Sequence, residues 1–220
     1  MSLDLKEALL HASRQVQTAR DYLCDLDAAL GDGDHGTSMA RSFAAVEKAL
    51  STSDSTDPVE LLELVGNTVL NAVGGAMGPL FGSAFLSSSL AVRTADSALS
   101  SPEKTAAAIS AAANAIQRRG KAVVGDKTMV DAIVPAAEAA AVAARVTGAT
   151  SATVLRAAAE AAAAGTEKTK ELIARIGRAS RLGDRTIGHQ DPGATSITLV
   201  LESLAASAGA PVGHPILTHS

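Results

Sequence analysis

The chain has 220 residues, enough for one domain with a sizeable core. Only 2% of the residues are aromatic, and Ala supplies much of the 47% hydrophobic fraction, which favours packed helices over a sheet. A net charge of −4 without a basic stripe argues against nucleic-acid binding, and the single cysteine excludes an internal disulfide framework. Neither a signal peptide nor a membrane span is expected, so a cytoplasmic protein is predicted.

Four helices are predicted in the N-terminal half. Apolar residues alternate four- and three-residue steps from Leu5 to Leu30, which predicts one continuous helix that ends at Gly31 and Gly33. A proline in the first turn, Pro58, favours a later helix start. The other three helices of this half are expected over about residues 36–50, 58–73 and 79–93.

Four more helices are predicted in the C-terminal half, over about residues 101–119, 128–145, 155–176 and 192–208. A Gly- and Arg-containing loop is expected over 177–191, before the last of them. Eight helices with short connections predict an all-α fold, an antiparallel bundle or closed barrel. A single domain is expected over residues 1–208, with a tail over 209–220.

Glycine and polar residues gather in four segments, 31–38, 74–82, 120–131 and 177–193. In an antiparallel path, the ends of the first, third, fifth and seventh helices lie on the same side of the bundle. All four segments should therefore meet at one rim, where a composite site is predicted.

Three carboxylates, Asp27, Asp32 and Asp34, lie within a stretch of eight residues that overlaps the first segment. Carboxylate oxygens are the ligands that Mg²⁺ and Ca²⁺ prefer. A calcium EF-hand is excluded, because the twelfth position counted from Asp32 is Phe43 rather than Glu. The remaining alternative to a metal site is a solvated acidic turn that caps the next helix.

The residues that follow, His35-Gly36-Thr37-Ser38, begin a predicted helix. Free backbone N–H groups and small hydroxyls at a helix N-terminus form an anion site. An anion site beside a carboxylate cluster is what a magnesium–phosphate complex requires. For His35 alone, an exposed turn histidine stays open as the alternative.

The segment 120–128 is similar to a phosphate-binding P-loop, but Asp126 stands where the motif requires lysine and no strand precedes it. That assignment is rejected, although Lys127 is still expected near the acids or phosphates. Met129 is expected to pack in the core rather than to contact a ligand.

Asp191 is predicted to cap the last helix. Its neighbours Arg178, Arg185 and His189 are predicted to form a polar pocket wall beside it. The sequence has neither a nucleophile elbow nor an HExxH pair, and Cys24 is expected to be a packed thiol.

Four segments, in family order and spacing, cover nearly the whole chain: LDAALGDGDHGTSMARSF, GGAMGPLFGSAF, RGKAVVGDKTMVDAIVPA and GRASRLGDRTIGHQDPGATS. Together they resemble the L subunit (DhaL) family of dihydroxyacetone kinase. The resemblance implies an eight-helix antiparallel barrel that binds ADP or ATP at one rim through two Mg²⁺ ions. The metal ligands that it implies are Asp27, Asp32 and Asp34. The nucleotide-binding residues that it implies are His35, Gly36, Thr37, Ser38, Ala76, Met77, Gly120, Met129, Arg178, Asp191, Pro192 and Gly193.

The same resemblance implies a kinase that transfers a phosphoryl group to dihydroxyacetone held on a separate K subunit, with no general base in this chain. In the branch linked to the phosphoenolpyruvate phosphotransferase system, an M subunit rephosphorylates ADP that stays bound; in the other branch, free ATP exchanges. A homodimer stays open as an assembly.

Three positions depart from the family pattern. Met77 replaces a small hydroxyl residue, Arg181 a commonly aromatic residue and Asp184 a commonly present Glu. Two further alternatives stay open: the nucleotide domain of an acyl kinase, and an ADP-loaded interaction module without enzymatic activity.

Overall fold

The computed structural model describes residues 3–72 and 74–212. The predicted all-α class is confirmed, since these residues contain helices and no strand. None of their helices is long and apolar enough to cross a membrane. The α-helices are α1 (Leu5–Thr18), α2 (Arg20–Ala28), α3 (His35–Thr52), α4 (Pro58–Ala72), α5 (Met77–Thr94), α6 (Ser101–Gly120), α7 (Val130–Ala143), α8 (Ser151–Lys168) and α9 (Pro192–Ser207).

The prediction of one continuous first helix is wrong. The chain bends at Ala19, with φ −77° and ψ 1°, and α2 continues from there. Helical hydrogen bonds still enter and leave the bend, from Ala19 N to the Gln15 oxygen and from Leu23 N to the Ala19 oxygen. Because the apolar spacing is unbroken across the bend, the sequence pattern does not reveal the change of direction.

The seventh predicted helix is also too long. The helix α8 ends at Lys168, and a short 3-10 helix, η1 (Thr169–Glu171), follows. The expected loop contains a second 3-10 segment, η2 (Arg178–Thr186). Position 73 of the third predicted helix, and positions 213–220 of the expected tail, lie outside the described residues.

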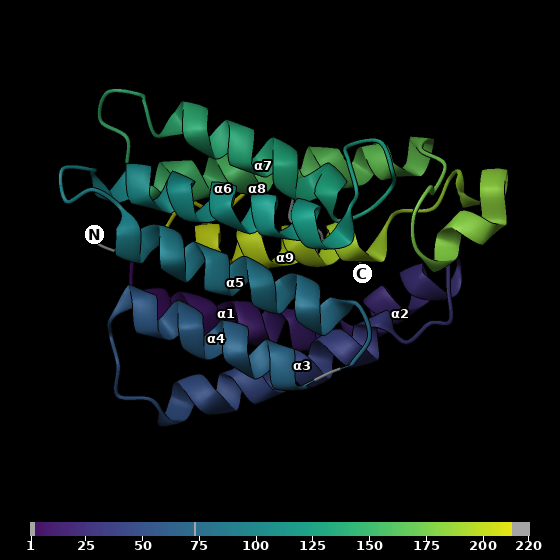
Figure 1. Ribbon diagram of the computed structural model, residues 1–220, viewed down its shortest axis with the longest axis horizontal. Helices are drawn as coiled ribbons and strands as arrows, with labels where there is room; N and C mark the ends of the chain where they lie inside the picture. The colour runs from purple at the N-terminus through teal and green to yellow at the C-terminus, as the bar shows by residue number, and fades with distance from the viewer. Residues whose placement is uncertain (1–2, 73, 213–220) are drawn as a thin grey trace.

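The long helices lie side by side with their axes roughly parallel (Figure 1). Each of the series α1, α3, α4, α5, α6, α7, α8 and α9 packs against the next, and α9 also packs against α1. This order of contacts is compatible with the predicted barrel. The short α2 packs mainly on α3 at one end.

Small residues allow the helices α7 and α8 to approach closely. Ala136, Ala140, Ala158 and Ala162 are fully buried on these two helices. A side chain at Gly165 would collide with the Asp131 carbonyl oxygen, so the backbones are in direct contact there. The close packing of α7 and α8 therefore depends on the small Ala and Gly residues at their contact.

The connections that follow α2, α4, α6 and α8 all lie at one end of the bundle, on the right of Figure 1. This is the arrangement expected from an alternating helix path. The four glycine-rich segments consequently converge, and the candidate site lies among them.

Candidate functional site

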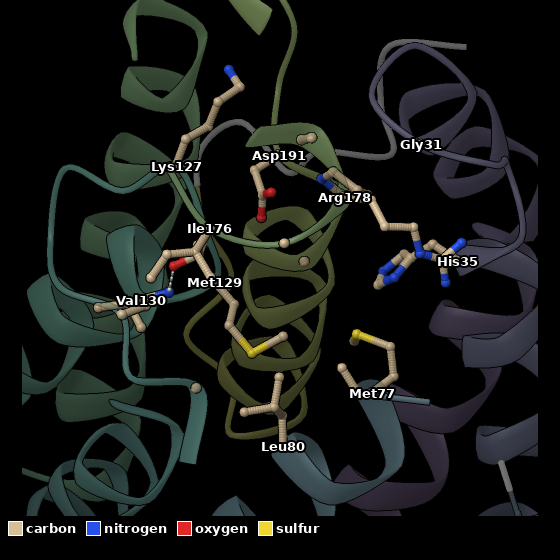
Figure 2. Close-up of a pocket in the computed structure, with 18 of the residues that line it drawn as sticks. Gly31, His35, Met77, Leu80, Lys127, Met129, Val130, Ile176, Arg178 and Asp191 are labelled. Carbon is tan, nitrogen blue, oxygen red and sulfur yellow. Dashed lines mark hydrogen bonds between the residues drawn. The ribbon is translucent and has the colours of Figure 1, made fainter. Parts of the chain in front are cut away.

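A cavity of about 490 Å³ opens at this end of the bundle. Each of the four predicted segments contributes to its lining: Gly31 and His35 from the first, Ala76, Met77 and Pro79 from the second, Gly120 and Met129 from the third, and Arg178, Asp191, Pro192 and Gly193 from the fourth. Asp27, in α2, lines it as well. The site is thus a composite one, and Figure 2 shows Met77, Met129 and Asp191 pointing inward from separate elements.

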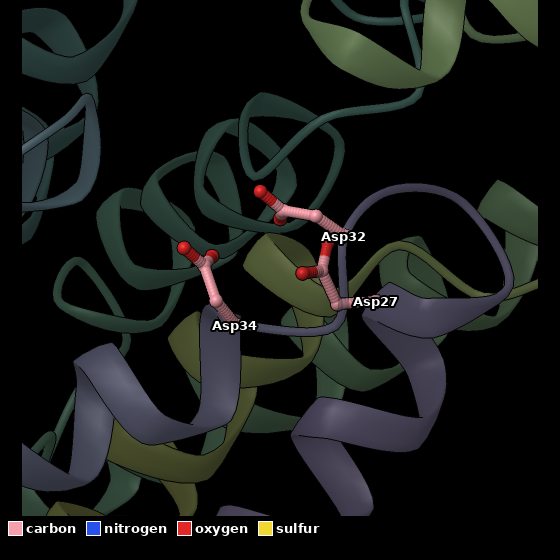
Figure 3. A group of neighbouring side chains, drawn as sticks. All are labelled: Asp27, Asp32 and Asp34. Atoms are coloured by element: carbon pink, nitrogen blue, oxygen red, sulfur yellow. The ribbon is translucent and has the colours of Figure 1, made fainter.

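Asp27, Asp32 and Asp34 gather beside this cavity (Figure 3), and of the three only Asp27 lines it. We call this group of carboxylates the acidic wall. Each offers a carboxylate oxygen that lies within 4.8 Å of the other two. Asp32 and Asp34 are exposed and Asp27 is half-buried. Three convergent carboxylates repel one another unless a cation lies between them, so the donor set fits a hard divalent cation such as Mg²⁺.

Arg178 belongs to the fourth segment but extends to the acidic wall. Its guanidinium forms an ion pair with Asp32 and lies 3.9 Å from an Asp34 oxygen. The side chain is exposed, so water screens these ion pairs strongly. Arg178 nevertheless joins the segment after α8 to the loop after α2, and it places a bidentate anion donor at the cavity mouth.

Asp27 links the acidic wall to the start of α3. Its carboxylate accepts a hydrogen bond of 3.2 Å from the backbone N–H of His35, whereas Asp34, the residue before α3, makes no side-chain cap. The helix start is therefore capped from α2. The two elements can approach this closely because residue 36 is glycine; a side chain there would collide with the Arg20 carbonyl oxygen.

His35 is buried, with only 6% of its surface exposed, so the alternative of an exposed turn histidine is wrong. Its Nε2 lies 2.8 Å from the Ser196 hydroxyl on α9. Burial lowers the pKa of His35 to about 4, against the opposing effect of Asp27. The imidazole is therefore neutral at pH 7 and ties α3 to α9.

Asp191 caps α9 as predicted, because its carboxylate accepts a hydrogen bond of 2.7 Å from the Ala194 N–H. Withdrawal from solvent raises the pKa of Asp191 to about 7, although the hydrogen bond from Ala194 opposes the shift. The nearby Asp131 raises the pKa further, and Lys127 lowers it. Asp191 and Lys127 form the buried wall of the site.

Lys127 lies near acids, as expected, but these are Asp131 and Asp191 rather than the acidic wall. Its side chain is buried and its ammonium donates to the carbonyl oxygens of Thr169 and His189. Asp131 shapes the same loop, since its carboxylate accepts hydrogen bonds from the N–H groups of Gly125 and Thr128.

Met77 and Met129 extend into the cavity from opposite sides (Figure 2). The prediction that Met129 is a core residue is confirmed, since it is buried, but it also lines the cavity. Leu80, Ile116 and Val130 add further apolar surface. Flexible thioethers and aliphatic side chains suit a flat aromatic group.

Some predicted residues lie outside the cavity lining. Gly36 packs against α2, and the hydroxyl of Thr37 lies 3.6 Å from the thiol of Cys24, a residue that is half-buried. Ser38 continues the helix, since its N–H donates to the Asp34 oxygen. The predicted wall of Arg178, Arg185 and His189 includes only Arg178 among the lining residues; Arg185 and His189 are exposed beside it. Two positions that depart from the family pattern, Arg181 and Asp184, are exposed in η2.

Sequence reasoning missed three parts of the site. Ser196, the partner of His35, lies one turn after the start of α9, and nothing in its sequence surroundings distinguishes it from the other small residues of that helix. Thr169 accepts a hydrogen bond of 2.9 Å from the Asp191 N–H through its hydroxyl, and the sequence places Thr169 inside a helix seam. Arg119 lines the cavity from the last turn of α6, where it reads as an ordinary surface residue.

The model of the DAK2 domain family matches residues 29–206. The chain belongs to the DAK2 domain family. This match extends from the loop before α3 almost to the end of α9 and includes all four glycine-rich segments, whereas Asp27 lies just before it.

Two relatives match most of the chain. The ADP-binding subunit DhaL of PEP-dependent dihydroxyacetone kinase 1 from Listeria innocua is 38% identical over 190 residues, 86% of this chain and 88% of the relative. The ADP-binding subunit DhaL of PEP-dependent dihydroxyacetone kinase from Escherichia coli is 39% identical over 191 residues, 87% of this chain and 90% of the relative. The resemblance to the DhaL family is therefore confirmed.

The fold is similar to that of a solved structure, the dihydroxyacetone kinase from C. freundii in complex with AMP-PNP and Mg²⁺, with a TM-score of 0.71 and 24% sequence identity. The similarity covers 92% of this chain and 33% of that one, so the chain spans about a third of that kinase. At this identity the likeness establishes the fold.

Proposed function

We propose that the chain is the nucleotide-binding subunit of a dihydroxyacetone kinase. ADP or ATP binds in the cavity, and a phosphoryl group passes to a hydroxyl of dihydroxyacetone held on a partner K subunit. The observation that carries this proposal is the juxtaposition of the acidic wall, two helix N-termini and an apolar cavity in one composite site. The two DhaL relatives, which match nearly their full length, support it.

Each part of the site suits one part of the nucleotide. Asp27, Asp32 and Asp34 would hold two Mg²⁺ ions, and bound Mg²⁺ neutralises phosphate charge and orients the phosphoryl group. His35, Gly36, Thr37 and Ser38, at the start of α3, would lie beside the phosphates; of their N–H groups, those of His35 and Ser38 already donate to Asp27 and Asp34. Arg178 adds a guanidinium at the cavity mouth.

The remaining lining suits the nucleoside. Met77 and Met129 offer apolar surface to the two faces of the base. Ala76 and Gly120, which are small, leave room for it between α5 and α6. Asp191, Pro192 and Gly193 form the floor at the start of α9. The loss of a hydroxyl at Met77 leaves phosphate binding to backbone donors and to Arg178.

In the proposed reaction the phosphoryl donor is a phosphoprotein M subunit, whose phosphoryl group comes from phosphoenolpyruvate. This subunit rephosphorylates ADP while the ADP stays bound. Both DhaL relatives carry PEP-dependent and ADP-binding in their names, which supports this branch. Exchange of free ATP is the alternative donor. A cytoplasmic location and a single domain over residues 1–208 belong to the same proposal, and a homodimer stays an untested assembly.

Calorimetry with ADP tests the binding part of the proposal. The chain should bind ADP in the presence of Mg²⁺ and lose that affinity in excess EDTA. Asp32→Ala should abolish the Mg²⁺-dependent part while the circular dichroism of the helices is unchanged, because Asp32 is exposed. ADP affinity that is equal in Mg²⁺ and EDTA would contradict the proposal.

Turnover separates the kinase from an interaction module. The chain, a K subunit and dihydroxyacetone should produce phosphorylated dihydroxyacetone when a phosphorylated M subunit is supplied. Turnover with ATP alone at the same rate indicates the exchange branch instead. Binding of the K subunit without any turnover would favour the module.

A further inference from the structure

Lys127 has an unusual position for a charged side chain. Only 2% of its surface is exposed, and lysine is among the residues least often buried to this extent. Its backbone is also left-handed, with φ 58°, a conformation that is unfavourable for most residues other than glycine, asparagine and aspartate. Both features are unfavourable to stability, so the side chain must provide something that glycine or asparagine would not.

The ammonium of Lys127 joins two segments that are distant in sequence. It donates to the carbonyl oxygen of Thr169, in η1, and to that of His189, two residues before Asp191. Thr169 reinforces the same junction, since its hydroxyl accepts from the Asp191 N–H at 2.9 Å. The start of α9 is therefore held from both sides by groups that converge on Lys127.

A second set of contacts fixes the loop that carries Lys127. The Asp126 carbonyl accepts from the Arg175 N–H at 3.1 Å, and the Asp126 carboxylate accepts from the Val123 N–H at 2.9 Å. Although Lys127 belongs to the cavity lining, its side chain points away from the two methionines in Figure 2. Its charge consequently acts on the backbone behind the cavity.

We infer that Lys127 is a positioning residue of the nucleotide site: its buried ammonium fixes the carbonyls of Thr169 and His189 and thereby sets the place of Asp191, Pro192 and Gly193 in the cavity floor. This inference rests on the proposed function. It assigns the buried wall a role in affinity through positioning of the cavity floor rather than through direct contact with the nucleotide.

Lys127→Asn tests it, because asparagine accepts a left-handed backbone but supplies no cation. ADP affinity in Mg²⁺ should fall about tenfold or more, the size expected from losing hydrogen bonds to a charged donor. Lys127→Arg should stay within about threefold of the natural chain, since guanidinium also donates to carbonyls. The matched control is Lys121→Asn, in the same loop, with φ 53° but an exposed side chain; its affinity should be unchanged.

Calorimetry separates positioning from mere loss of structure. If Lys127 only stabilised the fold, Lys127→Asn would lower the binding stoichiometry, through a smaller folded fraction, and leave the dissociation constant of the folded molecules unchanged. That result, or a Lys127→Arg variant as weak as Lys127→Asn with its helices intact, overturns the inference. The measurement is made below the thermal midpoint of every variant.

Thr169→Val keeps the test decisive if Lys127→Asn does not fold. It removes the hydroxyl that holds the Asp191 N–H without altering charge, and it should weaken ADP binding by about threefold or more. Unchanged affinity in Thr169→Val overturns the inference. Failure of the natural chain to bind ADP would instead contradict the proposed function, so the two failures are distinguishable.

Discussion

The two walls lie at the same cavity, but the charged side chains are exposed in one and buried in the other. The acidic wall presents Asp32 and Asp34 to solvent, where water and a cation can compensate them. The buried wall withdraws Lys127 and Asp191, and each is compensated by protein groups, mainly backbone. Exposed charges are available to a ligand, whereas buried charges with satisfied hydrogen bonds define shape.

This contrast predicts that substitutions in the acidic wall change ligand affinity more than stability. In the buried wall, both should change together. Asp27 is the informative exception, because it belongs to the acidic wall but also caps α3.

The largest effect is expected for Asp27→Ala. ADP affinity in Mg²⁺ should fall by about 100-fold through loss of a charged metal ligand. The free energy of unfolding should also fall by about 1 kcal/mol, because the His35 N–H loses its cap. Calorimetry and urea denaturation measure the two effects. Asp32→Ala is the matched control, with similar loss of affinity and unchanged stability; an equal loss of stability in both would erase the distinction.

A smaller effect is expected for Gly36→Ala. The added methyl group collides with the Arg20 carbonyl, so α2 must move away from α3, at a cost of about 1–3 kcal/mol in unfolding free energy. Since Asp27 moves with α2, Mg²⁺-dependent ADP binding should weaken as well. Gly74→Ala, where an added methyl meets no atom within 4 Å, should change neither quantity. A Gly36→Ala variant with unchanged unfolding free energy and ADP affinity would show that α2 and α3 are not in such close contact.

The pH dependence of stability should separate the walls further. The pKa of His35 is lowered to about 4, so the unfolded chain binds more protons between pH 4 and 6.5 and this group stabilises the fold increasingly as pH rises. The pKa of Asp191 is raised to about 7 from 3.8, so the folded chain binds more protons there and stability falls as pH rises from 4 to 7. The two contributions oppose each other in the natural chain.

Asp191→Asn should therefore remove the Asp191 contribution, so that only the His35 contribution to the pH dependence of stability remains. Its unfolding free energy, relative to that of the natural chain, should increase from pH 4 to 7, by at most about 1.4 kcal/mol per pH unit. His35→Gln should show the opposite slope between pH 4 and 6.5. Urea midpoints at several pH values measure both, and curves parallel to that of the natural chain would contradict the assigned pKa values.

The smallest effect is expected far from the cavity. Thr150 caps α8 by accepting a hydrogen bond from the Thr153 N–H. Thr150→Ala should cost about 1 kcal/mol in unfolding free energy and leave ADP affinity unchanged. Loss of affinity in this variant would mean that stability alone controls binding, which would remove the basis of the comparison between the two walls.

Much of the fold was accessible from local signals. The apolar spacing, the Ala-rich composition and the proline-marked start of α4 predicted helices that the structure confirms. The bend at Ala19 could not be predicted, since it leaves the spacing of the apolar residues unchanged. The end of α8 at Lys168 was missed for a related reason: the seam continues into 3-10 structure without a glycine or proline to mark the change.

The site was accessible in outline. An alternating helix path is enough to bring the four glycine-rich segments to one end, and Asp27, Asp32 and Asp34 are close in sequence as well as in space. The sequence did not predict which residues are buried. His35 has the sequence pattern of a polar turn residue, and only its contact with Ser196 on α9 shows that it is enclosed.

The sequence by itself determined the helical class, the close spacing of Asp27, Asp32 and Asp34, and the end of the bundle at which the glycine-rich segments meet. All three depend on residue type and on short-range spacing. Tertiary structure alone decided which charges are exposed and which are buried, because that depends on contacts between segments far apart in the chain. Lys127 and Thr169 lie 42 positions apart, and their contact exists only after α7 and α8 have packed.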